Sequence, residues 1–327
     1  MSRRTATAVA HPNIALIKYW GKRDEQLSLP ATGSLSLTLD IAPTRTTVTL
    51  APEAGDDVAT WQGEAMAGEE LTRVRSFLDL VRELAGSRAR AVVDTANEIP
   101  TGAGLASSAS GFAALAAAAA SAYGLDLNRR DLSRLARRGS GSAARSIFGG
   151  LVQWHAGDDD QSSYAEPLPD PGIDMALVLA VLTAGRKPVG SREAMRRTAT
   201  TSPFFGAWVE SVPGELEQMR RAIERTDFSA VGQLAESNAL RMHATMLGAT
   251  PPVRYWNAHT VAALDLVTQL RKDGVEAYAT IDAGPNVKVL CRRQDTAGVA
   301  DAFAAAFDGV DLLISGPGPG VWIEEPR

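Results

Sequence analysis

The chain has 327 residues, 45% of them hydrophobic and 22% charged, which is enough for a substantial core and two domains. Its formal net charge of −5 lacks the basic footprint of nucleic-acid-binding proteins. The single cysteine, Cys291, excludes an intrachain disulfide and a cysteine-rich metal site, as is usual in a reducing cytoplasm.

The sequence predicts neither a targeting segment nor a membrane span. Residues 1–10 carry two arginines but lack the apolar core of a signal peptide. Residues 105–123 are mostly alanine, which favours a buried helix over a span through lipid. The four histidines have no ligand spacing, so we expect no histidine metal site. We therefore expect a cytoplasmic protein that binds small molecules, with no nucleic acid and no membrane as partner.

The first half of the chain alternates segments typical of strands and of helices. Apolar residues at every second position predict strands, and apolar residues three or four apart predict helices with one buried face. These patterns predict strands at residues 34–40, 46–50, 91–94 and 150–155, and helices at 70–84, 105–123 and 126–138.

The second half opens with an apolar strand and is mainly helical as far as residue 273. We expect strands at 174–183, 277–291 and 310–315, and helices at 203–226, 227–247, 255–273 and 296–307. Residues 316–320 alternate glycine and proline, which predicts a rigid turn before a last strand. The whole pattern predicts an α+β protein of two domains, residues 1–185 and 186–327. The junction between such domains favours a ligand site.

The run at residues 98–111 has a composition suited to holding a polyphosphate. Gly102 and Gly104 permit close backbone approach and positive φ angles. Three serines bring hydroxyls to the start of the alanine-rich helix: Ser107, Ser108 and Ser110. Free N–H groups and the helix dipole favour an anion there. On spacing alone, a glycine-rich turn before a buried helix explains the run equally well.

A second candidate lies at residues 14–22, Ile-Ala-Leu-Ile-Lys-Tyr-Trp-Gly-Lys. Lys18 and Lys22 are four apart with two aromatic residues between them, and two cations beside aromatic rings suit a phosphorylated ligand. The alternative is a core strand whose lysines are solvated at its end.

A third candidate lies at residues 139–146, Gly-Ser-Gly-Ser-Ala-Ala-Arg-Ser. Two serines and Arg145 near a helix start can hold a carboxylate or a phosphate, since arginine binds such groups as a fork. The run also fits a loose dinucleotide-binding pattern, but that pattern should follow a strand, and here it follows a predicted helix.

The fourth candidate is Asp282, which ends an apolar strand and precedes Ala-Gly-Pro-Asn. A carboxylate at this place can point into a cleft, and the alternative is an aspartate that caps a turn. The sequence contains no G-x-S-x-G elbow, no H-E-x-x-H and no Walker A loop. A nucleotide would therefore bind through a different glycine loop.

Together these segments resemble the GHMP kinase superfamily and, within it, the mevalonate diphosphate decarboxylases. Four motifs in the expected order carry the resemblance, at residues 100–112, 17–22, 140–145 and 282–286. Weaker similarities lie at residues 35–39, 242–245 and 316–319. Four motifs in register over nearly the whole chain are far more specific than any one of them.

The resemblance implies a two-domain GHMP kinase fold. Its N-terminal ATP-binding domain is like domain 2 of ribosomal protein S5, and its C-terminal domain is ferredoxin-like. The implied activity is ATP-dependent decarboxylation of (R)-5-diphosphomevalonate to isopentenyl diphosphate in the mevalonate pathway, with release of CO2, ADP and phosphate. ATP and Mg²⁺ are the implied cofactors, and a homodimer is the implied assembly.

Carried over residue by residue, the resemblance gives roles to three charged groups. Asp282 orients or deprotonates the substrate hydroxyl, Lys18 neutralises charge around that oxygen, and Arg145 holds the substrate carboxylate. The other implied substrate contacts are Tyr19, Trp20, Gly21, Lys22, Arg73, Ser140, Gly141, Ser142, Ala143, Ala144 and Arg192. The implied nucleotide contacts are Pro100, Gly102, Ala103, Gly104, Leu105, Ala106, Ser107 and Ser108, with Ser108 nearest the Mg²⁺.

The sequence departs from the family pattern at two places. Residues 29–34, Leu-Pro-Ala-Thr-Gly-Ser, lack the asparagine that often follows Leu-Pro, and Gly190-Ser191 stands where a serine pair is more usual. The rival functions are a kinase of the same fold that phosphorylates mevalonate or its phosphate at O3, a decarboxylase of the monophosphate, and a non-catalytic metabolite binder. The joint presence of Asp282, Lys18 and Arg145 argues against the kinase, and an intact phosphate loop argues against the binder.

Overall fold

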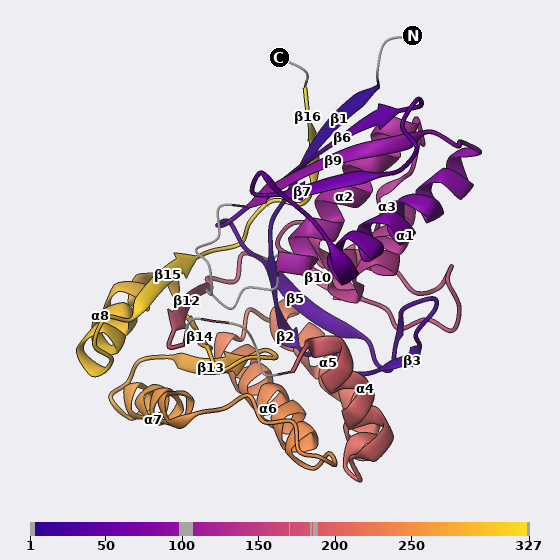
Figure 1. The fold of residues 1–327 in the computed structure, drawn as a ribbon. Coiled ribbons are helices and arrows are strands. Elements are labelled where there is room, and N and C mark those ends of the chain that lie inside the picture. Colours follow the sequence, from indigo (N-terminus) through magenta and orange to yellow (C-terminus); the bar gives the residue numbers. More distant parts are fainter. Residues whose placement is uncertain (1–3, 98–106, 170, 184, 186–188, 326–327) are drawn as a thin grey trace.

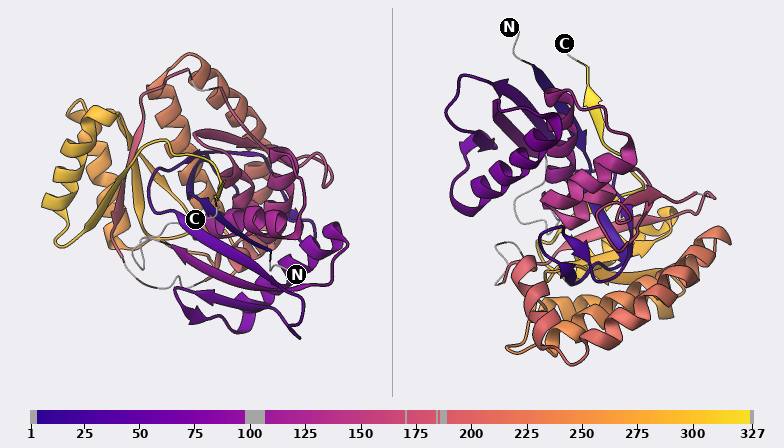
Figure 2. Two further views of the ribbon diagram at one scale, coloured as in Figure 1. Left: turned by 90° about the horizontal axis from the view of Figure 1, so that it is seen from above. Right: turned by 90° about the vertical axis from the view of Figure 1, so that its right-hand side faces the viewer.

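The computed structural model describes residues 4–97, 107–169, 171–183, 185 and 189–325. Most of the predicted phosphate loop lies outside these residues. The described part is built from three larger sheets and eight α-helices, arranged in layers (Figures 1 and 2).

A six-stranded sheet forms the upper layer in Figure 1, with the strand order β16-β1-β6-β9-β7-β8. Its strands are β1 (Thr5–Ala10), β6 (Thr44–Ala51), β7 (Val58–Trp61), β8 (Glu64–Ala65), β9 (Arg90–Asn97) and β16 (Trp322–Glu324). Along β9, buried and more exposed residues alternate, because one face of the sheet packs on the core and the other meets solvent. Neighbouring strands are antiparallel, except that β7 runs parallel to β9.

Helix α2 (Ser107–Tyr123) lies on the inner face of this sheet. Its alanines, Ala113 and Ala116 among them, are fully buried in one core with Ala8 and Val48 of the sheet. Small side chains permit a close approach of helix and sheet, so the alanine run is the surface by which α2 packs on the sheet. Helices α1 (Gly68–Ala85) and α3 (Arg129–Gly139) pack against α2 and contact each other; all three lie below the sheet in Figure 1.

A second sheet has the order β11-β10-β5-β2. Its strands are β2 (Asn13–Ile17), β5 (Ser34–Thr38), β10 (Leu151–Trp154) and β11 (Ala165–Pro167). Every residue of β2, β5 and β10 is buried, so these strands lie inside the molecule. The small hairpin of β3 (Lys22–Asp24) and β4 (Leu29–Pro30) follows β2, and the 3-10 helix η1 (Gly141–Ile147) packs beside β5 and β10. Two of the four motifs lie on these segments.

The lower layer is a sheet of order β13-β14-β12-β15 with helices on both faces. Its strands are β12 (Ala176–Val181), β13 (Ala277–Ile281), β14 (Val287–Cys291) and β15 (Asp311–Ser315), and its helices are α4 (Ser191–Thr201), α5 (Phe205–Glu224), α6 (Phe228–Leu247), α7 (Ala258–Lys272) and α8 (Thr296–Ala306), with the short η2 (Arg293–Asp295). Val267 of α7 and Phe303 of α8 are buried on one face, and α5 and α6 pack between the other face and β2.

The two halves of the chain share strands. β12 lies before residue 185 but pairs with β14 and β15, and β16 at the end of the chain pairs with β1. The segment before β16 runs so close to β5 that a Cβ on Gly318 would lie 1.9 Å from the carbonyl oxygen of Leu39, so only glycine fits there. The predicted division at residue 185 does not follow the sheets, and it stays a prediction.

Most predicted elements are found, with shifted ends. The helix predicted from residue 126 begins at Arg129, because the Asn128 side chain accepts the N–H of Asp131 and caps it. The strand predicted over 277–291 is two strands, and the turn between them carries Asp282. β1, β3, β4, β7, β8 and β11 were not predicted. Among the described residues, no helix is long and apolar enough to cross a membrane.

Candidate active site

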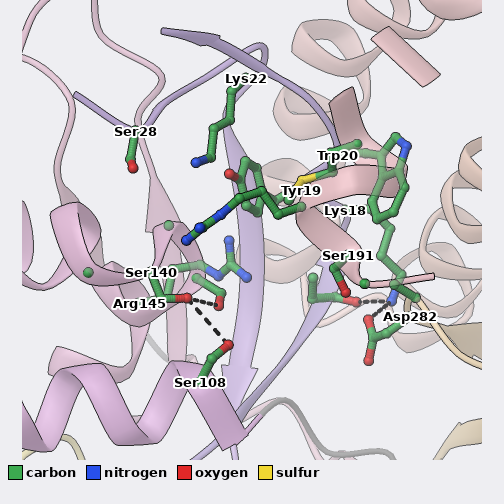
Figure 3. Close-up of a pocket in the computed structure, with 18 of the residues that line it drawn as sticks. Lys18, Tyr19, Trp20, Lys22, Ser28, Ser108, Ser140, Arg145, Ser191 and Asp282 are labelled. Atoms are coloured by element: carbon green, nitrogen blue, oxygen red, sulfur yellow. Dashed lines mark hydrogen bonds and ion pairs between the residues drawn. The ribbon is translucent and has the colours of Figure 1, made fainter. Parts of the chain in front are cut away.

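A cavity of about 360 Å³ lies where β2, η1, α2, α4 and the β13–β14 turn meet (Figure 3). Lys18, Arg145 and Asp282 all line it, although they come from three distant stretches of the chain. Serines at the starts of α2 and η1 line the side opposite Asp282. The structure therefore brings the three predicted charged groups together.

Lys18 follows β2 and is buried, with only 2% of its side chain exposed. Its Nζ donates to Asp282 Oδ1 at 2.7 Å and to the carbonyl oxygen of Ala15 at 2.8 Å. Its backbone N–H donates to Asn238 Oδ1 of α6 at 2.7 Å. Lys18 is thus fixed at both ends, and the alternative of a solvated strand end is wrong for this lysine.

Asp282 contacts a second cation as well. Lys288 of β14 places its Nζ 3.3 Å from Asp282 Oδ2. Burial raises the pKa of the Asp282 carboxyl, but the two lysines outweigh burial and hold that pKa well below its usual range. Burial lowers the pKa of Lys18, and Asp282 opposes that shift. The carboxylate is therefore ionised and bound to two lysines, which is a different role from the turn cap considered above.

Arg145 of η1 is buried beside the same cavity. Its Nε and Nη2 donate to Asn13 Oδ1 at 3.3 and 3.1 Å, and its Nη1 donates to Ser34 Oγ at 2.5 Å. Burial lowers the pKa of Arg145 to about 10, against the opposing effect of Asp282, so the guanidinium stays charged at neutral pH. A guanidinium has five N–H donors. Among the described residues, Nη1 and Nη2 each use one N–H group in these bonds, so each keeps one N–H group that can donate to an anion.

The hydroxyls of Ser140, Ser142 and Ser108 form a small group across the cavity. Ser140 Oγ lies 3.4 Å from Ser108 Oγ and 3.4 Å from Ser142 Oγ (Figure 3). Ser108 is the second residue of α2, so this group sits at the helix N-terminus, where an anion is favoured. A Cβ on Gly141 would come within 2.9 Å of Tyr19 Oη, so glycine lets Tyr19 pack here.

Three predicted contacts are not among the residues that line the cavity. The side chains of Ala143 and Ala144 are fully buried in the hydrophobic core, because η1 turns them toward α2. Gly21 has a φ of +93°, and a Cβ there would lie 2.5 Å from the Phe205 ring, so its role is to let the chain turn. That these three residues contact substrate stays a prediction, and any such contact would come from their backbone.

Tyr19, Trp20 and Lys22 do line the cavity. The Tyr19 ring packs edge-on against Trp154 with centroids 4.8 Å apart, and its buried Oη has no hydrogen-bond partner among the described residues. Burial raises the pKa of Tyr19, so it stays a neutral donor. Lys22 Nζ donates to Glu25 Oε2 at 2.9 Å, an exposed partner that an anionic ligand can replace.

Two arginines extend the positive charge toward the cavity mouth. Arg73 of α1 stacks over the Phe112 ring at 4.9 Å and donates to the carbonyl oxygen of Gly139 at 3.3 Å. Arg192 of α4 is half exposed, with its Nη1 3.8 Å from Glu69 Oε1. Both line the cavity, as predicted.

The predicted nucleotide contacts are only partly described. Six of them lie outside the described residues: Pro100, Gly102, Ala103, Gly104, Leu105 and Ala106. Ser107 begins α2, and Ser108 lines the cavity. Ser108 also lines a second, mostly apolar hollow of about 580 Å³ together with Trp61, Met66 and Phe112. The two hollows therefore meet at the N-terminus of α2.

Several residues of the site escaped prediction. Asn13 and Ser34 hold Arg145, Asn238 holds the backbone of Lys18, and Lys288 contacts Asp282. The residue pattern carries little signal for them, since an isolated asparagine or serine is common in any strand or helix. One signal was available for Lys288, which is a lysine in an otherwise apolar strand.

The layered fold and the charged cavity at a helix N-terminus define an enzyme with the GHMP kinase fold. Residues 10–165 match the model of the diphosphomevalonate decarboxylase-like N-terminal domain, and residues 176–314 match the mevalonate 5-diphosphate decarboxylase C-terminal domain. The chain belongs to the diphosphomevalonate decarboxylase family.

Individual relatives agree with this assignment. The human diphosphomevalonate decarboxylase is 38% identical over 93% of this chain and 80% of its own length. The phosphomevalonate decarboxylase of Haloferax volcanii is 34% identical over 96% of this chain and 95% of its own. A solved structure described as MDDEF in complex with MVAPP, AMPPCP and magnesium is 45% identical, with a TM-score of 0.96 over 99% of this chain and 100% of that one.

Proposed function

We propose that the chain catalyses the ATP-dependent decarboxylation of (R)-5-diphosphomevalonate to isopentenyl diphosphate, with CO2, ADP and phosphate as the other products. The observation that carries the proposal is the meeting of Asp282, Lys18 and Arg145 in one cavity beside the N-terminus of α2. The reaction needs a base, a cation near the C3 oxygen and a group that binds the substrate carboxylate. We assign these roles to Asp282, Lys18 and Arg145, respectively.

Asp282 acts on the C3 hydroxyl of the substrate. This alcohol is tertiary and a poor leaving group, so it must first receive the γ-phosphoryl group of ATP. Asp282 orients the hydroxyl and takes its proton as the new P–O bond forms. Because a carboxylate with a lowered pKa is a weak base, most of the acceleration must come from positioning and charge stabilisation, as in other phosphoryl transfers. Lys18 stabilises the negative charge on the C3 oxygen.

Arg145 holds the substrate carboxylate during the second half of the reaction. The C3–O bond breaks and phosphate leaves with the bonding electrons. The electrons of the bond between the carboxylate carbon and C2 then form the C2–C3 double bond, and CO2 is released. The free N–H groups on both terminal nitrogens of Arg145 can keep the carboxylate in line for this step.

The diphosphate end of the substrate is proposed to lie at the cationic mouth of the cavity. Lys22, Arg73 and Arg192 supply charge there, and Tyr19, Ser140 and Ser142 supply hydroxyls. Lys22 would exchange its contact with the exposed Glu25 for a phosphate oxygen. Such multiple charge-assisted contacts suit a diphosphate better than a single phosphate.

The nucleotide is proposed to bridge the two hollows at Ser108, with its base in the apolar hollow beside Trp61 and Phe112. The described residues contain no group of three or more His, Cys, Asp or Glu side chains that could hold a metal. The Ser108 hydroxyl at the phosphate site fits Mg²⁺, which commonly takes one or two protein ligands and binds mainly to phosphates and water. When bound, Mg²⁺ neutralises charge on the β- and γ-phosphates.

A cytoplasmic location and a homodimer complete the proposal. The single cysteine is buried, which agrees with a reducing compartment. Equilibrium sedimentation at micromolar concentration tests the homodimer directly, and a monomer at all concentrations rejects it.

The test of the proposed function is the release of ADP and CO2 from three substrates, namely mevalonate, 5-phosphomevalonate and 5-diphosphomevalonate. We expect both products in equal amounts, with kcat/KM highest for the diphosphate. ADP without CO2 would identify a kinase, and neither product would identify a binding protein. Preference for the monophosphate, the substrate named for the Haloferax relative, would reject the diphosphate assignment alone.

A further inference from the structure

Lys288 stands behind the site and does not belong to the wall of the cavity described above. It lies in β14, opposite Thr280 of β13, and only 2% of its side chain is exposed. Its Nζ is 3.3 Å from Asp282 Oδ2 and 3.4 Å from the carbonyl oxygen of Asn286. Lys288 therefore contacts Asp282, but it is not among the described residues that line the cavity.

A second buried lysine is not needed to neutralise Asp282. Lys18 already pairs with this carboxylate at 2.7 Å, and one cation balances one anion. The addition of Lys288 leaves the group with a surplus positive charge, which costs stability. The rest of β14 is apolar, so an aliphatic side chain at residue 288 would suit the strand better. Stability alone does not account for this lysine.

The two lysines hold different oxygens of the same carboxylate. Lys18 takes Oδ1 and Lys288 takes Oδ2, so the carboxylate plane is fixed at two points. With one point of contact an aspartate rotates readily, because its last torsion has a broad energy minimum. Each oxygen keeps a second lone pair for a substrate hydroxyl.

We propose that Lys288 is a positioning residue for the reaction, which holds Asp282 Oδ2 from behind and keeps the carboxylate aimed at the substrate hydroxyl. This inference rests on the proposed function. It predicts that Lys288 affects the chemical step and leaves substrate binding unchanged.

The dependence of kcat on pH can be interpreted from the charged and titratable groups that surround Asp282. They are Lys18 from the end of β2, Lys288 from β14, Arg145 from η1 and His243 from α6. Burial lowers the pKa of His243 to about 3, so this histidine stays neutral above pH 5. Loss of the Lys288 charge raises the pKa of Asp282, since that charge favours the carboxylate form. The acid limb of kcat against pH therefore moves to higher pH.

The experiment compares Lys288→Met, Lys288→Arg and a control, Lys272→Met, at an exposed lysine of α7. In Lys288→Met we expect kcat to fall roughly 10- to 100-fold, because a misplaced reacting group costs rate. The KM values for both substrates should stay within about threefold, because Lys288 is not among the residues that line the cavity. Lys288→Arg, which keeps the charge, should recover most of kcat. Lys272→Met should match the wild type.

Three results would overturn the proposal. These are a Lys288→Met enzyme with kcat within twofold of the wild type, a loss that appears in KM instead of kcat, and a loss of equal size in Lys288→Arg. If Lys288→Met does not fold, as judged by near-UV circular dichroism, Lys288→Gln carries the same test. A wild-type protein that releases no CO2 rejects the proposed function, whereas an active wild type with an unaffected Lys288→Met rejects only this inference.

Discussion

Asp282 shows how the surroundings of one side chain set its chemistry. Buried alone, a carboxyl group would hold its proton, but two lysines at its two oxygens keep it ionised. The same contacts make it a weak base, so orientation and the surrounding charges must add to its action as a proton acceptor. The proposed mechanism therefore depends on Lys18 as much as on Asp282.

Arg145 gives a direct test at this scale. Its Nε and Nη2 bind Asn13, and its Nη1 binds Ser34, so its planar fork is held rigidly. We expect Arg145→Lys to lower kcat about tenfold or more, because an ammonium keeps the charge but loses the two-pronged geometry. Steady-state CO2 release measures this, with Arg221→Lys, at an exposed ion pair of α5, as the matched control. Equal rates in Arg145→Lys and the wild type would show that the fork has no role.

At the residue scale, the sequence predicted the charged groups that line the cavity better than the groups behind them. Lys18, Arg145 and Asp282 stand in dense motifs whose residue types suggest anion chemistry. Asn13 and Ser34 belong to neighbouring strands, and only the antiparallel pairing of β2 with β5 brings both toward Arg145. No local pattern records that register.

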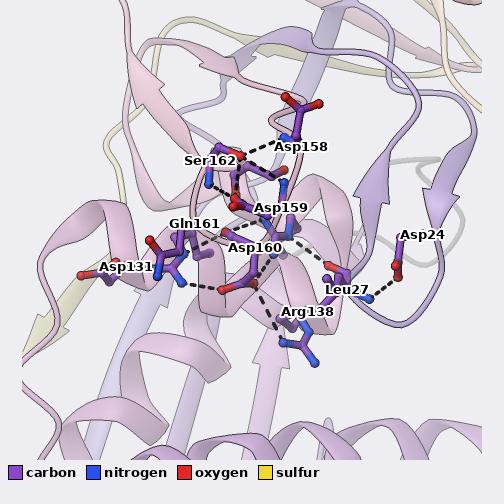
Figure 4. Close-up of polar contacts among 12 residues, drawn as sticks. Asp24, Leu27, Asp131, Arg138, Asp158, Asp159, Asp160, Gln161 and Ser162 are labelled. Atoms are coloured by element: carbon purple, nitrogen blue, oxygen red, sulfur yellow. Dashed lines mark hydrogen bonds and ion pairs between the residues drawn. The ribbon is translucent and has the colours of Figure 1, made fainter.

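Among the elements, α3 has a supporting role that its sequence does not reveal. Its arginines bind the acidic loop at residues 157–163, with Asp160 at the centre of the contacts (Figure 4). Arg137 is fully buried, pairs with Asp160, and also donates to the carbonyl oxygen of Leu27 at 3.2 Å. Leu27 lies in the β3–β4 hairpin, which carries Lys22 to the cavity. α3 thus connects the acidic loop with the hairpin.

Removal of Arg137 tests this connection. We expect Arg137→Met to lower the free energy of unfolding by about 3 kcal/mol, because Asp160 loses a buried partner and three carbonyl groups lose a donor. Urea denaturation measures the loss. The neighbouring Arg138→Met should lower the free energy of unfolding by less than about 1 kcal/mol, because Arg138 Nη1 lies 3.9 Å from Asp160 Oδ1 and the side chain is partly exposed. Equal losses in the two variants would contradict the role given to Arg137.

Helices and central strands were predictable because their apolar periodicity is strong. α1 shows this, with Val74, Phe77, Leu78 and Val81 buried along one face. β1 escaped prediction, because its Thr-Ala alternation contrasts little in hydrophobicity, and β8 and β11 are very short. Their pairing is decided by the sheet that they join and not by their own residues.

For the whole molecule, the active site depends on the contact between the two halves of the chain. Lys18 and Arg145 come from the N-terminal half, whereas Asp282 and Lys288 come from a hairpin in the lower sheet. β12 and β16 each pair with strands from elsewhere in the chain, which fixes the two layers against each other. Motif order indicated that these groups cooperate. In the structure, α6 packs against both β2 and β13, which places Lys18 beside Asp282.

The most direct test of the central claim is the Asp282→Asn variant, measured for both binding and turnover. Calorimetry should give a Kd for 5-diphosphomevalonate within about threefold of the wild type, because the amide keeps the shape of the carboxylate. CO2 release should fall roughly 10²-fold or more, because the amide cannot take the hydroxyl proton. Turnover close to that of the wild type, in a variant that binds substrate normally, would contradict the account.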